Sequence, residues 1–331
     1  MKNTEMELNI YKNKPSGVIL GFEPTDYIAG KSSPIKKHKE LTSDWRPYMP
    51  KHEIQFINDP NHTGNNTAVY ETSFCTAYSG TDVIETIFNY YIKNNLISKE
   101  DLDWLQEKGY IENGEVNLSE RYTGILAGLN EHGGYLSWIG DSLRNYGAIP
   151  NSMLPNNANS YEEYVSTDNI TQEMRDLGEE FKKRFPISYE WIPDNKAGEY
   201  LKYSPLHCTV RYATGEGILD PVGQHNHAVM EVYRTNEYEL INDSYYQETK
   251  KYKLGNPSYF LAYYIRLNNK DMIFKKDKNS SNIYLINEEH KTKTMVIDMP
   301  TLNAFYGEFE EADLSDYTEH GTFVWTERII N

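Results

Sequence analysis

Apolar residues recur at helical spacing in the first half of the chain. From Cys75 onward they fall on one face of a helix, and Asn94 and Asn95 mark its end. A second helix is predicted from Ser98, where Asp101 completes a capping box. Further amphipathic segments predict helices over 119–130, 137–146 and 171–185, with a Pro/Asn/Ser-rich loop over 150–166.

The pattern changes to alternation after about residue 186. Strands are predicted over 206–212, 228–233, 238–242 and 259–267. Because the helical segments precede the strands instead of alternating with them, the sequence predicts an α+β fold with an antiparallel sheet.

Composition changes near both ends of the chain, and it predicts four segments. Residues 1–43 are polar and broken by Gly and Pro, which indicates an extended N-terminal arm. The main domain is expected over 44–267, a Lys-rich linker over 268–282 and a small β appendage over 283–331. Within the appendage, 283–286 and 294–297 predict a hairpin, 307–320 an acidic tail and 323–325 a last strand.

Charge and cysteine content narrow the possible partners and compartments. The 331 residues carry a formal net charge of −16, so we expect neither nucleic acid nor an anionic membrane as a partner. Only two cysteines are present, which makes a secreted disulfide framework improbable. No secretory signal and no membrane-length apolar run is visible. We therefore expect a soluble protein of a reducing compartment.

The candidate chemistry lies in three residues. Cys75 opens the first predicted helix, His227 begins a predicted strand and Asp243 ends another. A thiolate needs a general base, and the base needs a third group that orients its ring. The positive end of a helix dipole and a nearby imidazolium both favour a thiolate. Asn242 is an alternative to Asp243, since an amide can orient the ring and strand alternation sends only one of the two toward the histidine.

A different interpretation of each candidate is structural. Cys75 could be a buried core cysteine, His227 a loop histidine beside His225, and Asp243 a turn residue. A zinc site built on His225 and His227 is disfavoured, because structural zinc usually needs four ligands and the chain has no Cys-x-x-Cys pair. We therefore expect no metal and no cofactor.

Several motifs together resemble the papain-like cysteine peptidases. The order cysteine, histidine, acid is that of the family, and His227 follows Cys75 at roughly the family's spacing of 150 residues. The segments that carry the resemblance are Asp44-Trp45-Arg46, Cys75-Thr76-Ala77-Tyr78-Ser79, Ile84-Glu85, Asn117-Leu118-Ser119-Glu120, Gly133-Gly134-Tyr135-Leu136, Asn226-His227-Ala228-Val229 and Tyr238 to Tyr245. They span about residues 44–267. Thr76 departs from the family pattern, which has Trp there, and Thr72 and Ser73 replace a cysteine and a glycine.

The resemblance implies a two-lobe fold, with a helical lobe and an antiparallel β-barrel-like lobe on either side of a cleft. It implies peptide-bond hydrolysis through a Cys75–His227–Asp243 triad and a thioester, with a protein or peptide as substrate. Gln55 would help to form the oxyanion hole. The backbone of Gly133 and Gly134 would pair with the substrate, beside Asn226 and Tyr245.

The resemblance is closer to bacterial and phage-encoded members than to secreted ones, because no signal peptide, helical propeptide or disulfide is apparent. The expected location is therefore cytoplasmic, in a bacterium or a phage-infected cell, or in a virion. Two alternatives stay open: another thiol-dependent amidase or acyltransferase on the same triad, and a non-catalytic phage structural or assembly module that keeps the fold.

Overall fold

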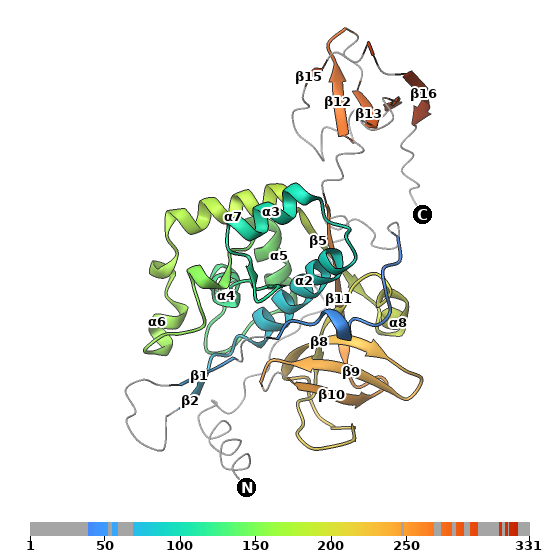
Figure 1. Cartoon of the computed structure of the whole chain (residues 1–331). Helices are drawn as coiled ribbons and strands as arrows, with labels where there is room; N and C mark the ends of the chain where they lie inside the picture. Colours follow the sequence, from blue (N-terminus) through green and yellow to red (C-terminus); the bar gives the residue numbers. More distant parts are fainter. Residues whose placement is uncertain are drawn as a thin grey trace. The chain divides into compact units, whose positions relative to one another are not determined.

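The protein is described from a computed structural model (Figure 1). The described residues are 39–51, 55–58, 69–245, 248–267, 273–279, 283–287, 292–296, 311–312, 315–316 and 318–323. The chain divides into two compact units, Met1–Leu267 and Asn268–Asn331. Most of the predicted N-terminal arm, and the start of the predicted linker, lie outside the described residues.

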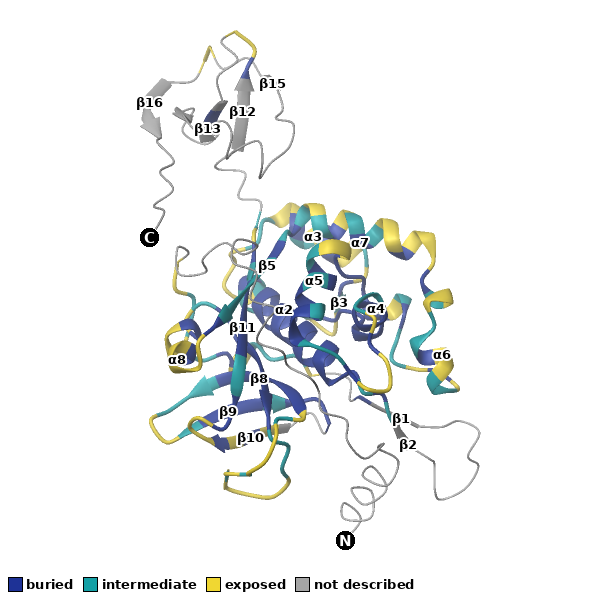
Figure 2. Ribbon diagram, turned by 180° about the vertical axis from the view of Figure 1, so that it is seen from behind, coloured by how far each residue is buried: buried dark blue, intermediate teal, exposed yellow. Residues whose placement is uncertain are grey.

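A long buried helix, α2 (Cys75–Lys93), forms the centre of the first unit. It packs against α4 and α5 on one side and against β8 and β6 on the other, so almost every residue of its first four turns is buried (Figure 2). A helix that is covered all round belongs to a core. The other helices are α3 (Lys99–Glu107), α4 (Glu120–Leu126), α5 (Leu136–Tyr146), α6 (Tyr161–Val165), α7 (Gln172–Arg184) and α8 (Ala197–Tyr200). Single 3-10 turns are η3 (Arg46–Tyr48), η4 (Asn151–Met153), η5 (Thr167–Asn169) and η6 (Asp194–Lys196).

The predicted helix boundaries are largely confirmed. Ser98 caps α3, since its hydroxyl accepts the Asp101 N–H at 3.0 Å, and Ser119 and Thr171 cap α4 and α7 in the same way. The helix predicted over 119–130 is shorter, because α4 ends at Leu126. The predicted loop over 150–166 is wrong in one part: Ser160 caps the short helix α6 within it.

The second half of the first unit is a seven-stranded sheet with the order β5-β11-β6-β8-β9-β10-β7. Its strands are β5 (Ile187–Ile192), β6 (Leu206–Val210), β7 (Ile218–Leu219), β8 (His227–Arg234), β9 (Tyr238–Asp243), β10 (Glu248–Lys253) and β11 (Ser258–Ile265). All pairings are antiparallel except that of β10 with β7. The fold is therefore α+β, as predicted. Among the described residues the end strands β5 and β7 do not pair, so the expected barrel-like lobe is an open sheet and not a closed barrel.

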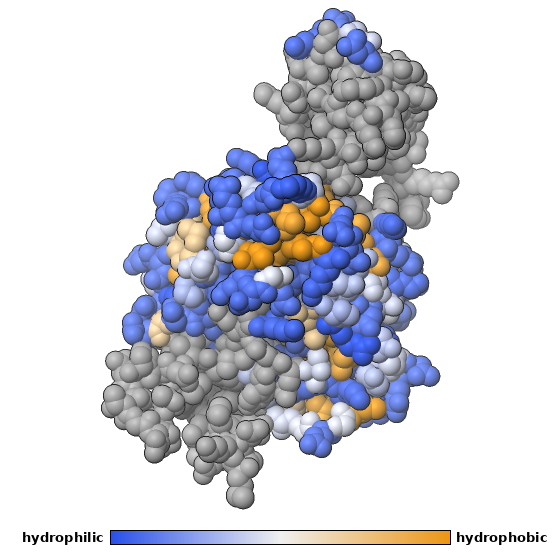
Figure 3. All heavy atoms as spheres, viewed as in Figure 1, coloured by the Kyte–Doolittle hydropathy of each residue, from blue (hydrophilic) through white to orange (hydrophobic). Residues whose placement is uncertain are grey.

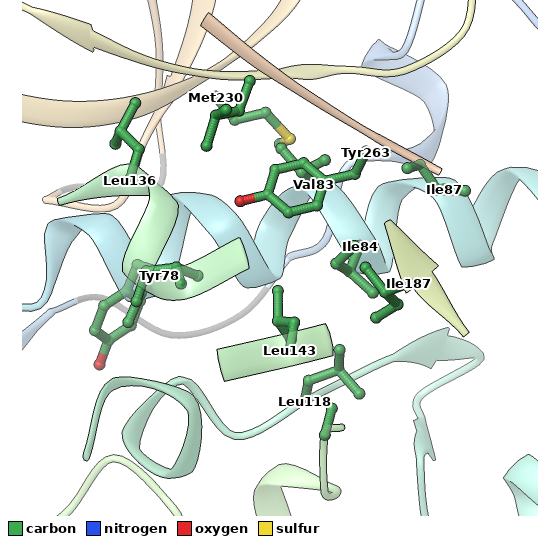
Figure 4. Close-up of a cluster of buried hydrophobic side chains, with 14 of the residues drawn as sticks. Tyr78, Val83, Ile84, Ile87, Leu118, Leu136, Leu143, Ile187, Met230 and Tyr263 are labelled. Atoms are coloured by element: carbon green, nitrogen blue, oxygen red, sulfur yellow. The ribbon is translucent and has the colours of Figure 1, made fainter. Parts of the chain in front are cut away.

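The core surrounds α2 and fills the space between this helix and the sheet on one side and the other helices on the other (Figure 4). In that view Val83 and Ile87 of α2 lie near Met230 of β8 and Tyr263 of β11, and all four are buried. Leu143 of α5 packs on the other side of the helix. Because both faces of α2 are covered, the position of its first residue is fixed by packing on two sides.

Two short hairpins complete the first unit. β1 (Phe56–Asn58) pairs with β2 (Val69–Glu71), with Phe56 opposite Glu71. β3 (Ile111–Glu112) pairs with β4 (Glu115–Val116). The β1–β2 hairpin leads directly into α2, so it determines what surrounds Cys75.

The second unit holds a five-stranded sheet with the order β15-β12-β13-β14-β16. Its strands are β12 (Ile273–Asp277), β13 (Ile283–Asn287), β14 (Thr292–Val296), β15 (Glu311–Ala312) and β16 (Thr318–Phe323). The antiparallel β13–β14 pair confirms the predicted hairpin. β12 lies within 268–282, for which the sequence predicts a linker.

The described surface is mainly polar on the face shown in Figure 3. The large apolar side chains that are exposed in the described part are Leu96, Tyr146, Ile218, Val222 and Leu254. Among the described residues, no helix has the length and hydropathy of a membrane span.

Candidate active site

Cys75 is the first residue of α2, and its side chain is only 2% exposed. The preceding residue, Phe74, gives no side-chain cap to the helix. The first N–H groups of a helix have no intrahelical acceptor, and they carry the positive end of the helix dipole. Cys75 is therefore placed at the positive end of the α2 dipole.

His227 and Asp243 meet at the ends of two adjacent strands. His227 opens β8 and Asp243 closes β9, and these strands pair in antiparallel fashion. His227 Nε2 lies 2.8 Å from Asp243 Oδ1, and both side chains are almost fully buried. This bond fixes the plane of the imidazole and leaves Nδ1 for the other side of the ring.

The neighbouring Asn242 points elsewhere. Its side-chain amide donates to Asp82 Oδ2 at 3.1 Å, on α2. Consecutive residues of a strand face opposite sides of the sheet, so β9 brings the carboxylate of Asp243 and not the amide of Asn242 to His227.

Electrostatics favour the charged forms of both partners. Burial alone would lower the pKa of His227, but the Asp243 carboxylate and then Cys75 outweigh it and raise the pKa to about 9. Burial alone would raise the pKa of Asp243, but His227 and Lys250 outweigh it and lower that pKa. Near neutral pH the pair is therefore an imidazolium and a carboxylate.

Nδ1 of His227 has no hydrogen bond of good geometry among the described residues. The Cys75 side chain is nevertheless close enough to contribute to the raised pKa of the ring. The structure thus brings the thiol and the imidazole together with Nδ1 unused by other groups, as a proton transfer between them requires.

Two tyrosines enclose the histidine. The Tyr245 ring lies 4.1 Å from the His227 ring at 34°, and its backbone N–H donates to Asp243 Oδ1 at 3.0 Å. The Tyr212 ring meets His227 edge-on at 5.3 Å and Tyr245 at 5.0 Å. These rings exclude water from the His227–Asp243 bond, and this strengthens it electrostatically.

Lys250 is a member of the site that the sequence analysis missed. Its ammonium lies 2.7 Å from Asp243 Oδ2, and the side chain is only 6% exposed. Lys250 lies in β10, a strand of sequence Glu-Thr-Lys-Lys-Tyr-Lys. Its position shortly after Asp243, in a segment that alternates like a strand, could have indicated it. The many charged residues of that segment made the strand difficult to predict.

Gln55 is buried just before the β1–β2 hairpin that precedes α2. Its side-chain amide donates to the Glu71 carboxylate, and its Oε1 accepts the Ser244 hydroxyl at 2.7 Å. Its backbone carbonyl accepts the Thr72 N–H at 3.3 Å. These bonds hold Gln55 between the residue after Asp243 and the segment that leads to Cys75.

The predicted substrate-binding glycines lie in a turn that contacts the entry to α2. The carbonyl of Glu131 accepts the Ser73 hydroxyl at 3.0 Å. Gly133 adopts φ +78°, which favours glycine, and a Cβ at Gly134 would lie 2.3 Å from Leu129 Cδ2. Asn226 is exposed, and its side-chain oxygen accepts the Tyr212 N–H at 2.8 Å.

Potential metal ligands do not gather at the triad in the described part of the chain. His225 Nδ1 lies 2.7 Å from the Thr209 hydroxyl. The carboxylates of Asp82, Glu85 and Glu120 are buried with ligand atoms within 4.8 Å of one another. Asn242 donates to the first of these, and the Leu118 N–H donates to Glu85 Oε1 at 2.6 Å.

No family model matches the chain, and no curated protein matches it. Among solved structures, a cysteine protease of Carica candamarcensis (CMS1MS2, in complex with E-64) matches with 16% identity and a TM-score of 0.41, over 70% of this chain and 100% of that chain.

Proposed function

We propose that the protein is a cysteine peptidase of the papain-like type, with Cys75 as its nucleophile. The observation that carries the proposal is the buried His227–Asp243 bond of 2.8 Å, with Nδ1 of the same ring left for the Cys75 thiol at the start of α2. A nucleophile, a base and an orienting acid in this relation are what acyl transfer to a thiol requires.

The second cysteine supports this choice of nucleophile. Cys208 is fully buried in β6, and burial raises the pKa of its thiol well above the ordinary value. A thiol in that environment is not ionised near neutral pH and is inert. Cys75 is therefore the cysteine that can react.

In the proposed reaction the Cys75 thiolate attacks the carbonyl carbon of a peptide bond, and a carbon–sulfur bond forms. The carbon–nitrogen bond then breaks, and the leaving amine takes a proton from His227 Nδ1. Water then gives a proton to His227 Nδ1 as its oxygen attacks the thioester carbonyl carbon, a carbon–oxygen bond forms, and the carbon–sulfur bond breaks to release the acid and the Cys75 thiolate. Asp243 keeps the ring in place through both steps, and Tyr245 and Tyr212 keep water from its bond to His227.

The oxyanion would be held by the Cys75 N–H and by Gln55. The primary amide of a glutamine has two hydrogens, and the bond to Glu71 uses one of them. We propose that the other points to the developing oxyanion. One such donor typically contributes about 3–4 kcal/mol to transition-state stabilisation.

A protein or peptide is the proposed substrate, with its backbone along Gly133 and Gly134. The Ser73–Glu131 bond ties this turn to the residues directly before Cys75. This position next to the nucleophile is the support for the assignment. Asn226 is proposed to line the same region.

The test is intact-mass spectrometry after brief exposure to a peptidyl epoxide near neutral pH. We expect a single rapid addition in the wild-type protein and in Cys208→Ala, and none in Cys75→Ala. Peptide cleavage should be lost in Cys75→Ala alone. Equal loss in both variants, or no labelling of the wild type, would reject the proposal in favour of a non-catalytic module. Labelling with turnover of cell-wall amides but not of peptides would replace it with another thiol amidase.

A further inference from the structure

Lys250 is bound to the face of Asp243 that His227 does not use. Asp243 Oδ1 accepts from His227 Nε2 and the Tyr245 N–H, and Oδ2 accepts from the Lys250 ammonium. We infer that Lys250 is a positioning residue of the active site, whose ammonium offsets the charge of Asp243 while the carboxylate orients the His227 ring. The inference deepens the proposed function and rests on it.

The net charge of the buried site explains why a cation beside Asp243 is needed. In the reactive form Cys75 is a thiolate and His227 an imidazolium, so these two charges cancel. A lone Asp243 would leave one net negative charge in a buried site, where uncompensated charge is costly. The ammonium of Lys250 brings the sum of the four groups back to zero.

The geometry shows that the lysine is built into the site. Its ammonium lies 4.7 Å from the centre of the Tyr212 ring, and that ring also contacts His227 and Tyr245. Asp243 and Glu248 are opposite each other in the β9–β10 pairing, and Lys250 is two residues further along the strand. An aromatic face on one side and a carboxylate on the other hold the ammonium in one place.

The groups that face the His227 ring are Cys75 of α2, Asp243 of β9, Tyr212 after β6 and Tyr245 after β9. The groups that face Asp243 are His227 and Lys250 of β10. Glu71 of β2 acts on Tyr245. Lys250 and His227 are both cations that act on Asp243, so removal of Lys250 changes the charge of the site by one.

The inference predicts opposite effects for two substitutions. Lys250→Met leaves Asp243 uncompensated, and the extra negative charge favours the protonated forms of both Cys75 and His227. The profile of kcat/KM against pH is expected to be bell-shaped, with one limb set by Cys75 and the other by His227. Both limbs should then move to higher pH, by about one pH unit or more. Asp243→Asn leaves the lysine uncompensated, and both limbs should move to lower pH.

The double variant Asp243→Asn/Lys250→Met should return the profile to its wild-type position, because a neutral amide needs no cation. Lys250→Arg keeps the charge and should not move the profile. Lys251→Met is the matched control, since Lys251 is exposed on the same strand, with its ammonium 5.0 Å from the Tyr238 ring. A role in stability alone would lower all rates without displacing the profile.

We would measure two quantities against pH for each variant: the rate at which iodoacetamide alkylates Cys75, located by peptide mass spectrometry, and kcat/KM for a peptide. Opposite displacements in the single variants with restoration in the double variant would establish the inference. Displacement in the same direction, or none, would overturn it.

The experiment still tests the role of Lys250 if one variant does not fold or if the protein cleaves no peptide. If Lys250→Met does not fold, Asp243→Asn and the double variant still report the lysine, because its removal must reverse the shift. If the wild-type protein cleaves no peptide, the proposed function fails, and alkylation still measures the coupling between Lys250 and Cys75.

Discussion

Asn242 and Asp243 are adjacent in β9, yet they bond to opposite sides of the sheet. Asn242 donates to Asp82 on α2, whereas Asp243 accepts from His227. The strand thus sends one side chain into the helix–sheet interface and the other to the candidate base. The two residues can therefore be separated by substitution.

Asp243→Ala should lower kcat/KM by about 100-fold or more, because the imidazole loses its orienting acceptor. Asn242→Ala removes a hydrogen bond of the core instead, and should cost about 1 kcal/mol of unfolding free energy with little change in kcat/KM. Peptidase assays and urea denaturation of both variants check this. Equal loss of activity would show that the amide also acts on the base.

His207 should make the protein sensitive to acid. It is fully buried, its Nδ1 lies 3.0 Å from the Tyr263 hydroxyl, and burial lowers its pKa from 6.5 to about 3. Between these values the unfolded chain binds a proton that the folded protein does not, so stability falls as pH falls from 6.5 toward 3.

In His207→Gln, the dependence of the unfolding free energy on pH should therefore decrease by up to about 1.4 kcal/mol per pH unit in that window. Urea denaturation at pH 6, 5 and 4 measures the slope. His132→Gln, at an exposed position, serves as the control. An unchanged slope in the His207 variant would mean that the ring is already charged in the folded protein.

Gly80 is predicted to tolerate no side chain. An added Cβ would lie 2.5 Å from Ile139 Cγ2 and 3.2 Å from His207 Cε1. Gly80→Ala should destabilise by about 1–3 kcal/mol through overpacking between α2, α5 and β6. In Gly198→Ala the nearest atom is Arg234 Cδ at 3.3 Å, a milder contact than at Gly80, so the gain in helix propensity should leave the variant closer to wild-type stability than Gly80→Ala. Thermal unfolding of the two variants compares them directly.

Arg121 holds the segment around α6 to the rest of the first unit. Its guanidinium donates to the carbonyls of Tyr164 at 2.9 Å and of Asn157 and Glu163 at 2.7 Å. Lysine cannot reproduce this fork. Arg121→Lys should therefore speed hydrogen exchange and proteolysis within 155–165, whereas Arg175→Lys, at an exposed position, should not. Protection equal to wild type would show that packing alone fixes the segment.

The sequence predicts those helices and strands that have a clear periodicity of apolar residues. The apolar periodicity after Cys75, the alternation after His227 and the alternation before Asp243 predict α2, β8 and β9, so the three candidate residues could be chosen from chain order. The choice between Asn242 and Asp243 could not be made, since it depends on which face of β9 meets the helix. That face is fixed by pairing with β8, a tertiary relation.

Other elements are hidden by their composition. β10 carries three lysines and a glutamate, so its hydrophobic pattern is too weak to predict a strand. Because the strand was not predicted, Lys250 was not recognised as part of the site. Ser160 is a good cap, but the Pro and Asn residues before it indicate a loop, so α6 was not predicted. The bonds of Gln55 to Glu71 and Ser244 join segments far apart in the chain, and no local pattern indicates them.

The pairing of β8 with β9 also sets an order of assembly. His227 and Asp243 belong to one continuous hairpin, so they can meet through local folding, whereas Cys75 belongs to a helix much earlier in the chain and meets them only through a long-range contact. A nascent chain that has not yet reached β8 holds Cys75 without its partner. Under the proposed function, reactivity of the thiol is thus coupled to completion of the unit, and an unfinished chain carries Cys75 without its proposed base.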